Sequence, residues 1–144
     1  MNQGRFQIVT SASSLERSSG GSISGILAVR LADFVFPDEH WSDFPVVVLG
    51  WWSDAARALQ AAREGEFLFM DGPFKFRVLP PHDGVSGVAF EKMEAHGARQ
   101  LHSGVLDPAD LSAEIARASR EIVRECRNRG WADADVGKLS QAVN

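Results

Sequence analysis

The chain has 144 residues, of which 44% are hydrophobic and 24% charged, and its net charge is −4 at pH 7. This length predicts a single domain, residues 1–144, with a core large enough to fold without a disulfide or a structural metal. The negative charge and the lack of any unbroken run of Lys or Arg argue against nucleic-acid binding, which needs several cations on one face.

The first quarter of the chain predicts two strands separated by a loop. Alternating apolar residues favour a short strand over residues 5–10, and the Ser- and Gly-rich residues 11–24 predict a loop. Residues 26–36 are rich in β-branched and aromatic side chains, which favour a second strand. The glycine-rich piece at 19–22 lacks the Gly-Lys-Ser/Thr ending of a P-loop, so it predicts a turn.

Residues 44–64 carry two competing signals. The aliphatic residues near the start favour a strand, yet apolar side chains recur every three or four residues along the whole segment, as in a helix. Asp43 precedes the segment as a possible N-cap, and Gly65 follows it as a natural end. We predict one helix over residues 44–64, with a strand at 45–49 followed by a shorter helix as the alternative.

Residues 66–79 predict a β-hairpin, because two alternating apolar runs flank turn residues at 71–73. Pro73 has no N–H and cannot donate the closing hydrogen bond of a two-residue turn, so we expect a longer turn. Residues 85–93 and 98–105 predict a second hairpin directly after the first.

The last third of the chain predicts two helices. Asp107 is a natural N-cap and Pro108 suits the first position of a long helix that stops at Gly130. A short last helix follows, with Asp133 as its cap. The single cysteine, Cys126, lies on the apolar face of the long helix, which predicts a buried, inert thiol and excludes an internal disulfide.

These elements predict an α+β fold. Its expected form is a two-layer domain in which a mostly antiparallel sheet of about five or six strands packs against two or three helices. The N-terminus has no apolar segment typical of a signal peptide, and the longest apolar run, residues 44–52, is too short to span a bilayer. We therefore expect a cytoplasmic protein with no membrane partner.

No residue pattern predicts a catalytic, cofactor-binding or metal site. The histidines lack the spacing of a metal-binding motif, and no Gly-x-Ser-x-Gly nucleophile elbow is present. We therefore expect a protein that is not an enzyme. The alternative is a small hydrolase or transferase whose unrecognised site draws on His82, His96, His102 and Asp71.

The acidic, aromatic loop of residues 38–43 is the candidate partner-binding site. It combines three acids with an aromatic anchor, a mixture that suits a basic protein partner. The candidate contact residues are Asp38, Glu39, His40, Trp41 and Asp43 in this loop, and Lys75 and Arg77 on the outer face of the first hairpin. Alternatively, Trp41 packs into the core beside the helix that follows.

Three segments resemble a family of small bacterial proteins that confer immunity to polymorphic toxins: residues 36–52 (FPDEHWSDFPVVVLGWW), 69–74 (FMDGPF) and 126–131 (CRNRGW). The similarity in layout covers residues 23–140. It implies an immunity protein that binds a cognate toxin domain in the cytoplasm and occludes its active site, without catalytic residues of its own. Nuclease and deaminase toxin domains are often basic, which suits a partner with a net charge of −4.

The expected state in solution is a monomer or a weak homodimer. The first alternative to toxin immunity is a structural or regulatory homo-oligomer that pairs through a free sheet edge.

Overall fold

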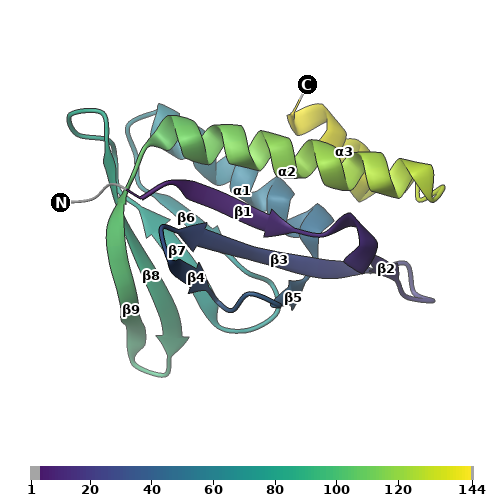
Figure 1. Cartoon of the computed structure of the whole chain (residues 1–144), viewed down its shortest axis with the longest axis horizontal. Helices are drawn as coiled ribbons and strands as arrows, with labels where there is room; N and C mark the ends of the chain where they lie inside the picture. Colours follow the sequence, from purple (N-terminus) through teal and green to yellow (C-terminus); the bar gives the residue numbers. More distant parts are fainter. Residues whose placement is uncertain (1–3, 144) are drawn as a thin grey trace.

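The computed structural model describes residues 4–143. Within this range the chain forms three α-helices and two antiparallel sheets, one of five strands and one of four (Figure 1). The predicted α+β class, with antiparallel strands packed against helices, is confirmed. The strands are divided between two sheets, whereas we expected one.

The first sheet is built around the long strand β3 (Ile23–Leu31). All of its partners run antiparallel to it: β1 (Phe6–Thr10), β2 (Glu16–Arg17), β4 (Phe34–Phe36) and β5 (Ser42–Asp43). Because β3 pairs with four short strands at different points along its length, it organises the whole N-terminal third of the chain.

Two predictions for this region need correction. The single strand expected over residues 26–36 is two strands, because the chain reverses at Ala32, whose φ of 54° is left-handed, and β4 folds back onto β3. The loop expected over residues 11–24 contains a 3-10 turn (Ala12–Ser14) and the strand β2. The reversal has no local sequence signal of the usual Gly or Pro kind, whereas the turn that joins β2 to β3 contains Gly20 and Gly21.

The second sheet is a meander of four strands. Its strands are β6 (Gly65–Leu68), β7 (Phe74–Val78), β8 (Ser86–Glu94) and β9 (Gly97–Leu106), hydrogen-bonded in that order. Both predicted hairpins are confirmed. The turn of the first is longer than two residues, as Pro73 requires: it spans residues 69–73, and Phe69 N–H donates to the Phe74 carbonyl at 3.1 Å.

The helices are α1 (Pro45–Gln60), α2 (Pro108–Asn128) and α3 (Ala134–Ala142). A single helix in the segment 44–64 is confirmed, and the alternative strand at 45–49 is wrong. The helix ends at Gln60, earlier than expected, and Gly65 begins β6. The expected apolar stripe is buried at Val48 and Leu59, but between them Trp52 is completely buried in place of Trp51, which stays 41% exposed. Within residues 4–143, no helix is both long and apolar enough to cross a membrane.

Of the three predicted N-caps, one is confirmed and two are wrong. Asp43 precedes the N-cap residue of α1, Phe44, and within residues 4–143 no side chain caps this helix. The Asp107 carboxylate caps α2 by accepting the N–H of Ala109 at 2.8 Å. Asp133 precedes α3, but its side chain does not cap the helix, because its carboxylate instead accepts a hydrogen bond from Arg17 at 2.8 Å. Cys126 is fully buried, as expected, and burial raises the pKa of its thiol.

The core lies between the two sheets and the helices, and aromatic rings fill it. The rings of Phe36 on β4 and Phe90 on β8 are 5.2 Å apart, so they join one sheet to the other. Trp52 of α1 packs edge-on against Phe69 and Phe76, at 5.2 and 5.3 Å. Burying each such ring stabilises the fold by about 2–3 kcal/mol. Figure 1 shows α1 and α2 on one side of the strands.

The helix α2 also closes the outer edge of β1. Glu114 Oε1 accepts the N–H of Ile8 at 2.8 Å, and Arg117 donates to the carbonyl of Ile8 at 2.7 Å. The two side chains thus replace the hydrogen bonds that a neighbouring strand would make.

Candidate functional site

The predicted partner-binding loop is tied to the turn of the first hairpin by the carboxylate of Asp43, which is only 1% exposed. Four N–H groups donate to its two oxygens: those of the Trp41 indole (2.9 Å), the Phe44 backbone (2.8 Å), the Met70 backbone (3.2 Å) and the Asp71 backbone (3.1 Å). Asp43 is therefore an internal anchor of the loop, and its carboxylate is not available to a partner.

Trp41 packs inward, on the turn of the hairpin. It is half-buried, and its ring meets that of Phe74 edge-on, with 5.3 Å between the centroids. Its six-membered ring lies against the backbone of Gly72. The alternative role for Trp41 therefore holds in part: it packs against the core, but its contact is the hairpin turn and not the helix that follows.

The other three loop residues lie at the surface. Asp38, Glu39 and His40 are all exposed. The Asp38 carboxylate accepts the backbone N–H of His40 at 2.8 Å, and His40 Nε2 lies 3.6 Å from a Glu39 oxygen. These residues can contact a partner directly, unlike Asp43.

Lys75 and Arg77 form ion pairs across the open face of the second sheet. Arg77 donates two hydrogen bonds of 3.1 Å to Glu91, whose side chain is 7% exposed, and a third of 2.8 Å to Glu64. Lys75 Nζ lies 2.9 Å from Glu66. The hydrogen bonding of Arg77 to the Glu91 carboxylate is the main reason that the pKa of Arg77 is raised. Both cations are thus engaged within the sheet.

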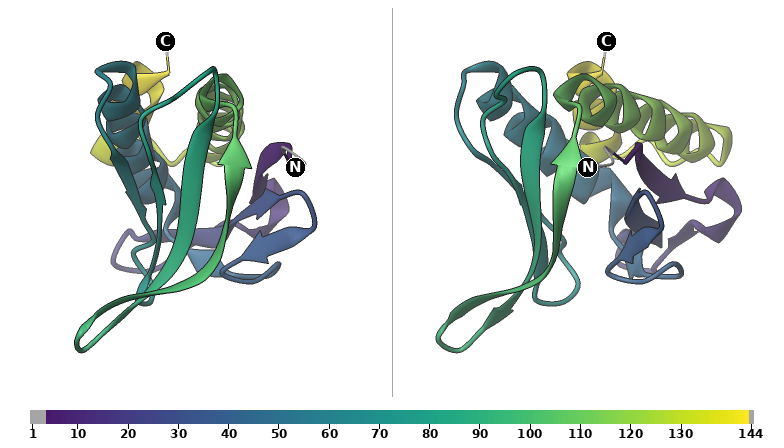
Figure 2. Two further views of the ribbon diagram at one scale, coloured as in Figure 1. Left: turned by 90° about the vertical axis from the view of Figure 1, so that its left-hand side faces the viewer. Right: turned by 60° about the vertical axis from the view of Figure 1, so that its left-hand side comes forward.

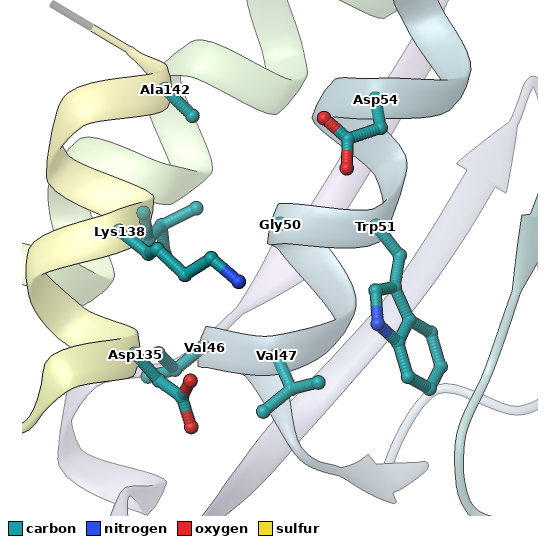
Figure 3. Close-up of a pocket in the computed structure, with 9 residues that line it drawn as sticks. Val46, Val47, Gly50, Trp51, Asp54, Asp135, Lys138 and Ala142 are labelled. Carbon is teal, nitrogen blue, oxygen red and sulfur yellow. The ribbon is translucent and has the colours of Figure 1, made fainter.

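The structure brings together a second group of residues that the sequence patterns did not single out. Two adjoining grooves run along α1, one between α1 and α3 and the other between α1 and the loop at residues 20–23. They share Val46, Val47 and Asp135. Figure 3 shows Lys138 and Asp135 extending from α3 toward α1 in the first groove.

Exposed apolar side chains line these grooves. Trp51 of α1 is 41% exposed and Met70, in the hairpin turn, is 40% exposed. Because Met70 donates its N–H to Asp43, the grooves adjoin the loop at residues 38–43. We call the grooves and the adjoining loop together the acidic face. Its groove residues are Val47, Trp51, Asp54, Met70, Asp133, Asp135 and Lys138, and beside them it includes Asp71, which follows Met70 in the chain, and the exposed loop residues Asp38 and Glu39.

The charge of the acidic face is predominantly negative. Asp54 and Asp133 are paired with Arg57 and Arg17, at 2.6 and 2.8 Å. By contrast, within residues 4–143 no Lys or Arg lies within 4.0 Å of the other four carboxylates, which belong to Asp38, Glu39, Asp71 and Asp135. A surface that pairs exposed apolar anchors with unneutralised carboxylates is complementary to a basic, partly apolar protein surface.

The residues of the alternative enzymatic site are not brought together. His82 and His96 lie in turns at opposite ends of β8, and His102 stacks on Phe34 with 4.0 Å between the rings. Asp71 lies in the turn of the other hairpin. In the described part of the chain, no group of three or more His, Cys, Asp or Glu side chains is placed to hold a metal ion.

Comparison of the chain with models of known protein families, with curated proteins and with solved structures gives no match. The resemblance to immunity proteins therefore stays a prediction from the sequence. The fold adds one relationship to it: residues 36–52 and 69–74, which carry the resemblance, contact each other through Asp43 and Trp41.

Proposed function

We propose that the protein neutralises a basic toxin domain by binding to it through the acidic face and covering its active site. The observation that carries this proposal is the pairing of two exposed apolar anchors, Trp51 and Met70, with four unneutralised carboxylates on one surface. Aromatic and Met side chains dominate the energy of protein interfaces, while charge complementarity speeds association and selects the partner.

The support around the anchors also favours binding. Trp51 projects from a helix that is held in the core by its neighbour Trp52, and the Met70 backbone is held by its hydrogen bond to Asp43. Side chains on such rigid elements lose little conformational freedom when a partner binds, so more of the interaction energy appears as affinity.

The acidic face suits a toxin whose active site binds phosphate groups. Such sites are rich in Lys and Arg, because cations are needed to attract a nucleic acid. Carboxylates facing those cations would both attract the toxin and exclude its substrate. An interface of ordinary size buries about 1,600 Å² in total, about half of it on each partner.

The experiment is affinity capture of the tagged protein with its partners from the native host, followed by mass spectrometry. We expect a stoichiometric partner that carries a basic toxin domain, and protection of cells that express this toxin. Trp51→Ala and Asp135→Lys should each weaken the complex at least tenfold, which corresponds to about 1.4 kcal/mol. Raising the salt concentration should weaken the wild-type complex.

Leu79→Ala is the matched control, because Leu79 is 46% exposed but lies outside the acidic face. Asp38→Lys tests the loop separately, since its side chain is exposed and its loss leaves the anchor Asp43 in place. A toxin complex that both acidic-face variants retain at full affinity would show that binding occurs elsewhere. A protein that neither captures a toxin nor protects cells from one would refute the proposed function.

A further inference from the structure

The fold treats its sheet edges unequally. The edge of β1 is closed by Glu114 and Arg117 of α2. The edge of β6 is held against α1, where the Trp52 indole donates to the Leu68 carbonyl at 2.9 Å. In the described part of the chain, neither a strand nor a side chain forms a hydrogen bond with the outer edge of β9.

The open edge is long, and most of it is exposed. The strand β9 has ten residues, and every residue from 97 to 103 is exposed. Figure 2 shows the hairpin of β8 and β9 extending beyond the rest of the sheet, away from the helices. Leu101, in the middle of this edge, is 40% exposed.

An edge of this kind attracts another strand, because its outward N–H and C=O groups are unpaired. Proteins usually protect such an edge with Lys, Pro or several charges, whereas residues 95–106 contain neither Lys nor Pro, and Arg99 is their one charged side chain. A β-bulge is the protective feature that is present: Phe90 pairs with His102 and Glu91 with Gln100, so Leu101 is the extra residue of β9 and the strand is irregular at that point.

We propose that the outer edge of β9 pairs antiparallel with the same edge of a second copy of this chain. Antiparallel pairing through the exposed residues 97–103 forms a two-fold symmetric dimer in which the two four-stranded sheets become one continuous sheet. Leu101 of each copy then lies at the paired edge, where its exposed side chain packs against the other copy.

Charge favours a second copy over a basic partner at this edge. Two chains of net charge −4 repel each other, so they associate best where neither carries negative charge, and residues 95–106 contain no Asp or Glu. A basic partner would instead meet Arg99 here, and the acidic face suits it better. No residue of β9 belongs to the acidic face, so this inference is independent of toxin binding.

The test is sedimentation velocity of the isolated full chain from a few micromolar to several hundred micromolar. We expect the mass to rise with concentration from 15.7 kDa toward twice that value. Leu101→Lys replaces the exposed leucine at the paired edge of both copies with a charge and should abolish the dimer. Leu79, which directly follows β7, is similarly exposed, and Leu79→Lys should leave the dimer unchanged.

Hydrogen–deuterium exchange provides a second readout, independent of any variant. The amides of residues 97–105 should become protected as the protein concentration rises, while those of the hairpin at residues 66–78 should not change. A chain that stays monomeric throughout, or a dimer that Leu101→Lys leaves intact, would overturn the proposal. Protection of β9 that requires a different added protein would also overturn it, in favour of a foreign strand.

Discussion

The indole N–H of Trp41 donates to the carboxylate of Asp43 at 2.9 Å, and this carboxylate also accepts the backbone N–H groups of Met70 and Asp71. Asp43 and Met70 are 27 residues apart in the chain. One buried carboxylate therefore joins an acidic loop to a hairpin turn, and the two segments become parts of one surface.

Replacing Asp43 should destabilise the contact between the acidic loop and the hairpin turn. Asp43→Ala leaves four N–H donors without their acceptor, so we expect the free energy of unfolding to fall by about 3 kcal/mol. Urea denaturation followed by tryptophan fluorescence measures the change. Asp38→Ala is the control, because its carboxylate is exposed and accepts one hydrogen bond, and it should cost less than about 1 kcal/mol. Equal losses would contradict the assigned role of Asp43.

A side chain at position 72 should destabilise the fold, because it would meet the ring of Trp41. Its φ is +106°, and an added Cβ would lie 2.9 Å from Cη2 of the Trp41 ring. Gly84 also has a positive φ, +81°, but an added Cβ there meets nothing within 4 Å. We expect Gly84→Ala to cost about 1 kcal/mol of stability from backbone strain, and Gly72→Ala about 2 kcal/mol or more. Thermal unfolding of both variants compares them, and similar losses would show that the Trp41 contact is unimportant.

The ion pair between Arg77 and Glu91 should be costly to break on one side only. Arg77→Leu leaves the Glu91 carboxylate, which is 7% exposed, with only the distant ammonium of Lys75 at 4.0 Å. We expect a loss of about 2–3 kcal/mol in the free energy of unfolding. Adding Glu91→Leu to that variant should restore part of the loss, since the unpaired charge is removed. A double variant less stable than Arg77→Leu would argue against this account.

Stability should fall in acid partly through Glu114. Burial by itself raises the pKa of Glu114, but hydrogen bonds from Arg117 and the Ile8 N–H outweigh burial and hold the pKa below its ordinary 4.5. A carboxyl with a lowered folded-state pKa stabilises the fold above the unfolded value and loses this effect as the pH falls through the folded value. Below about pH 4.5, the wild type should therefore lose stability more steeply than Glu114→Gln. Parallel pH profiles for the two proteins would exclude this contribution.

Patterns within a few residues were enough to predict most of the secondary structure. The apolar stripe of residues 44–64 predicted α1, and Asp107 with Pro108 located the start of α2. Pro73 predicted that the first hairpin has a long turn. These signals are local, because helix period, capping and turn chemistry depend on neighbours in the chain. The reversal at Ala32 escaped prediction because no Gly or Pro marks it.

The candidate site could be predicted only in part. The loop at residues 38–43 was recognisable from its composition. Its sequence did not show that Asp43 is buried, nor that Lys75 and Arg77 are engaged within their own sheet. The exposure of Trp51 had a weak signal, since two adjacent residues of a helix point about 100° apart and cannot both face the core. No sequence signal predicted that Trp51 lines the same groove as Asp135, because α3 lies more than 80 residues further along the chain.

The sequence by itself determined the fold class and the approximate places of the helices and of the two hairpins, since these follow from interactions between residues close in the chain. Tertiary structure alone decided which carboxylates are buried, which cations are paired and which sheet edge stays open. Those properties depend on packing between segments far apart in the chain, and the same Asp is an exposed charge at residue 38 and an internal acceptor at residue 43.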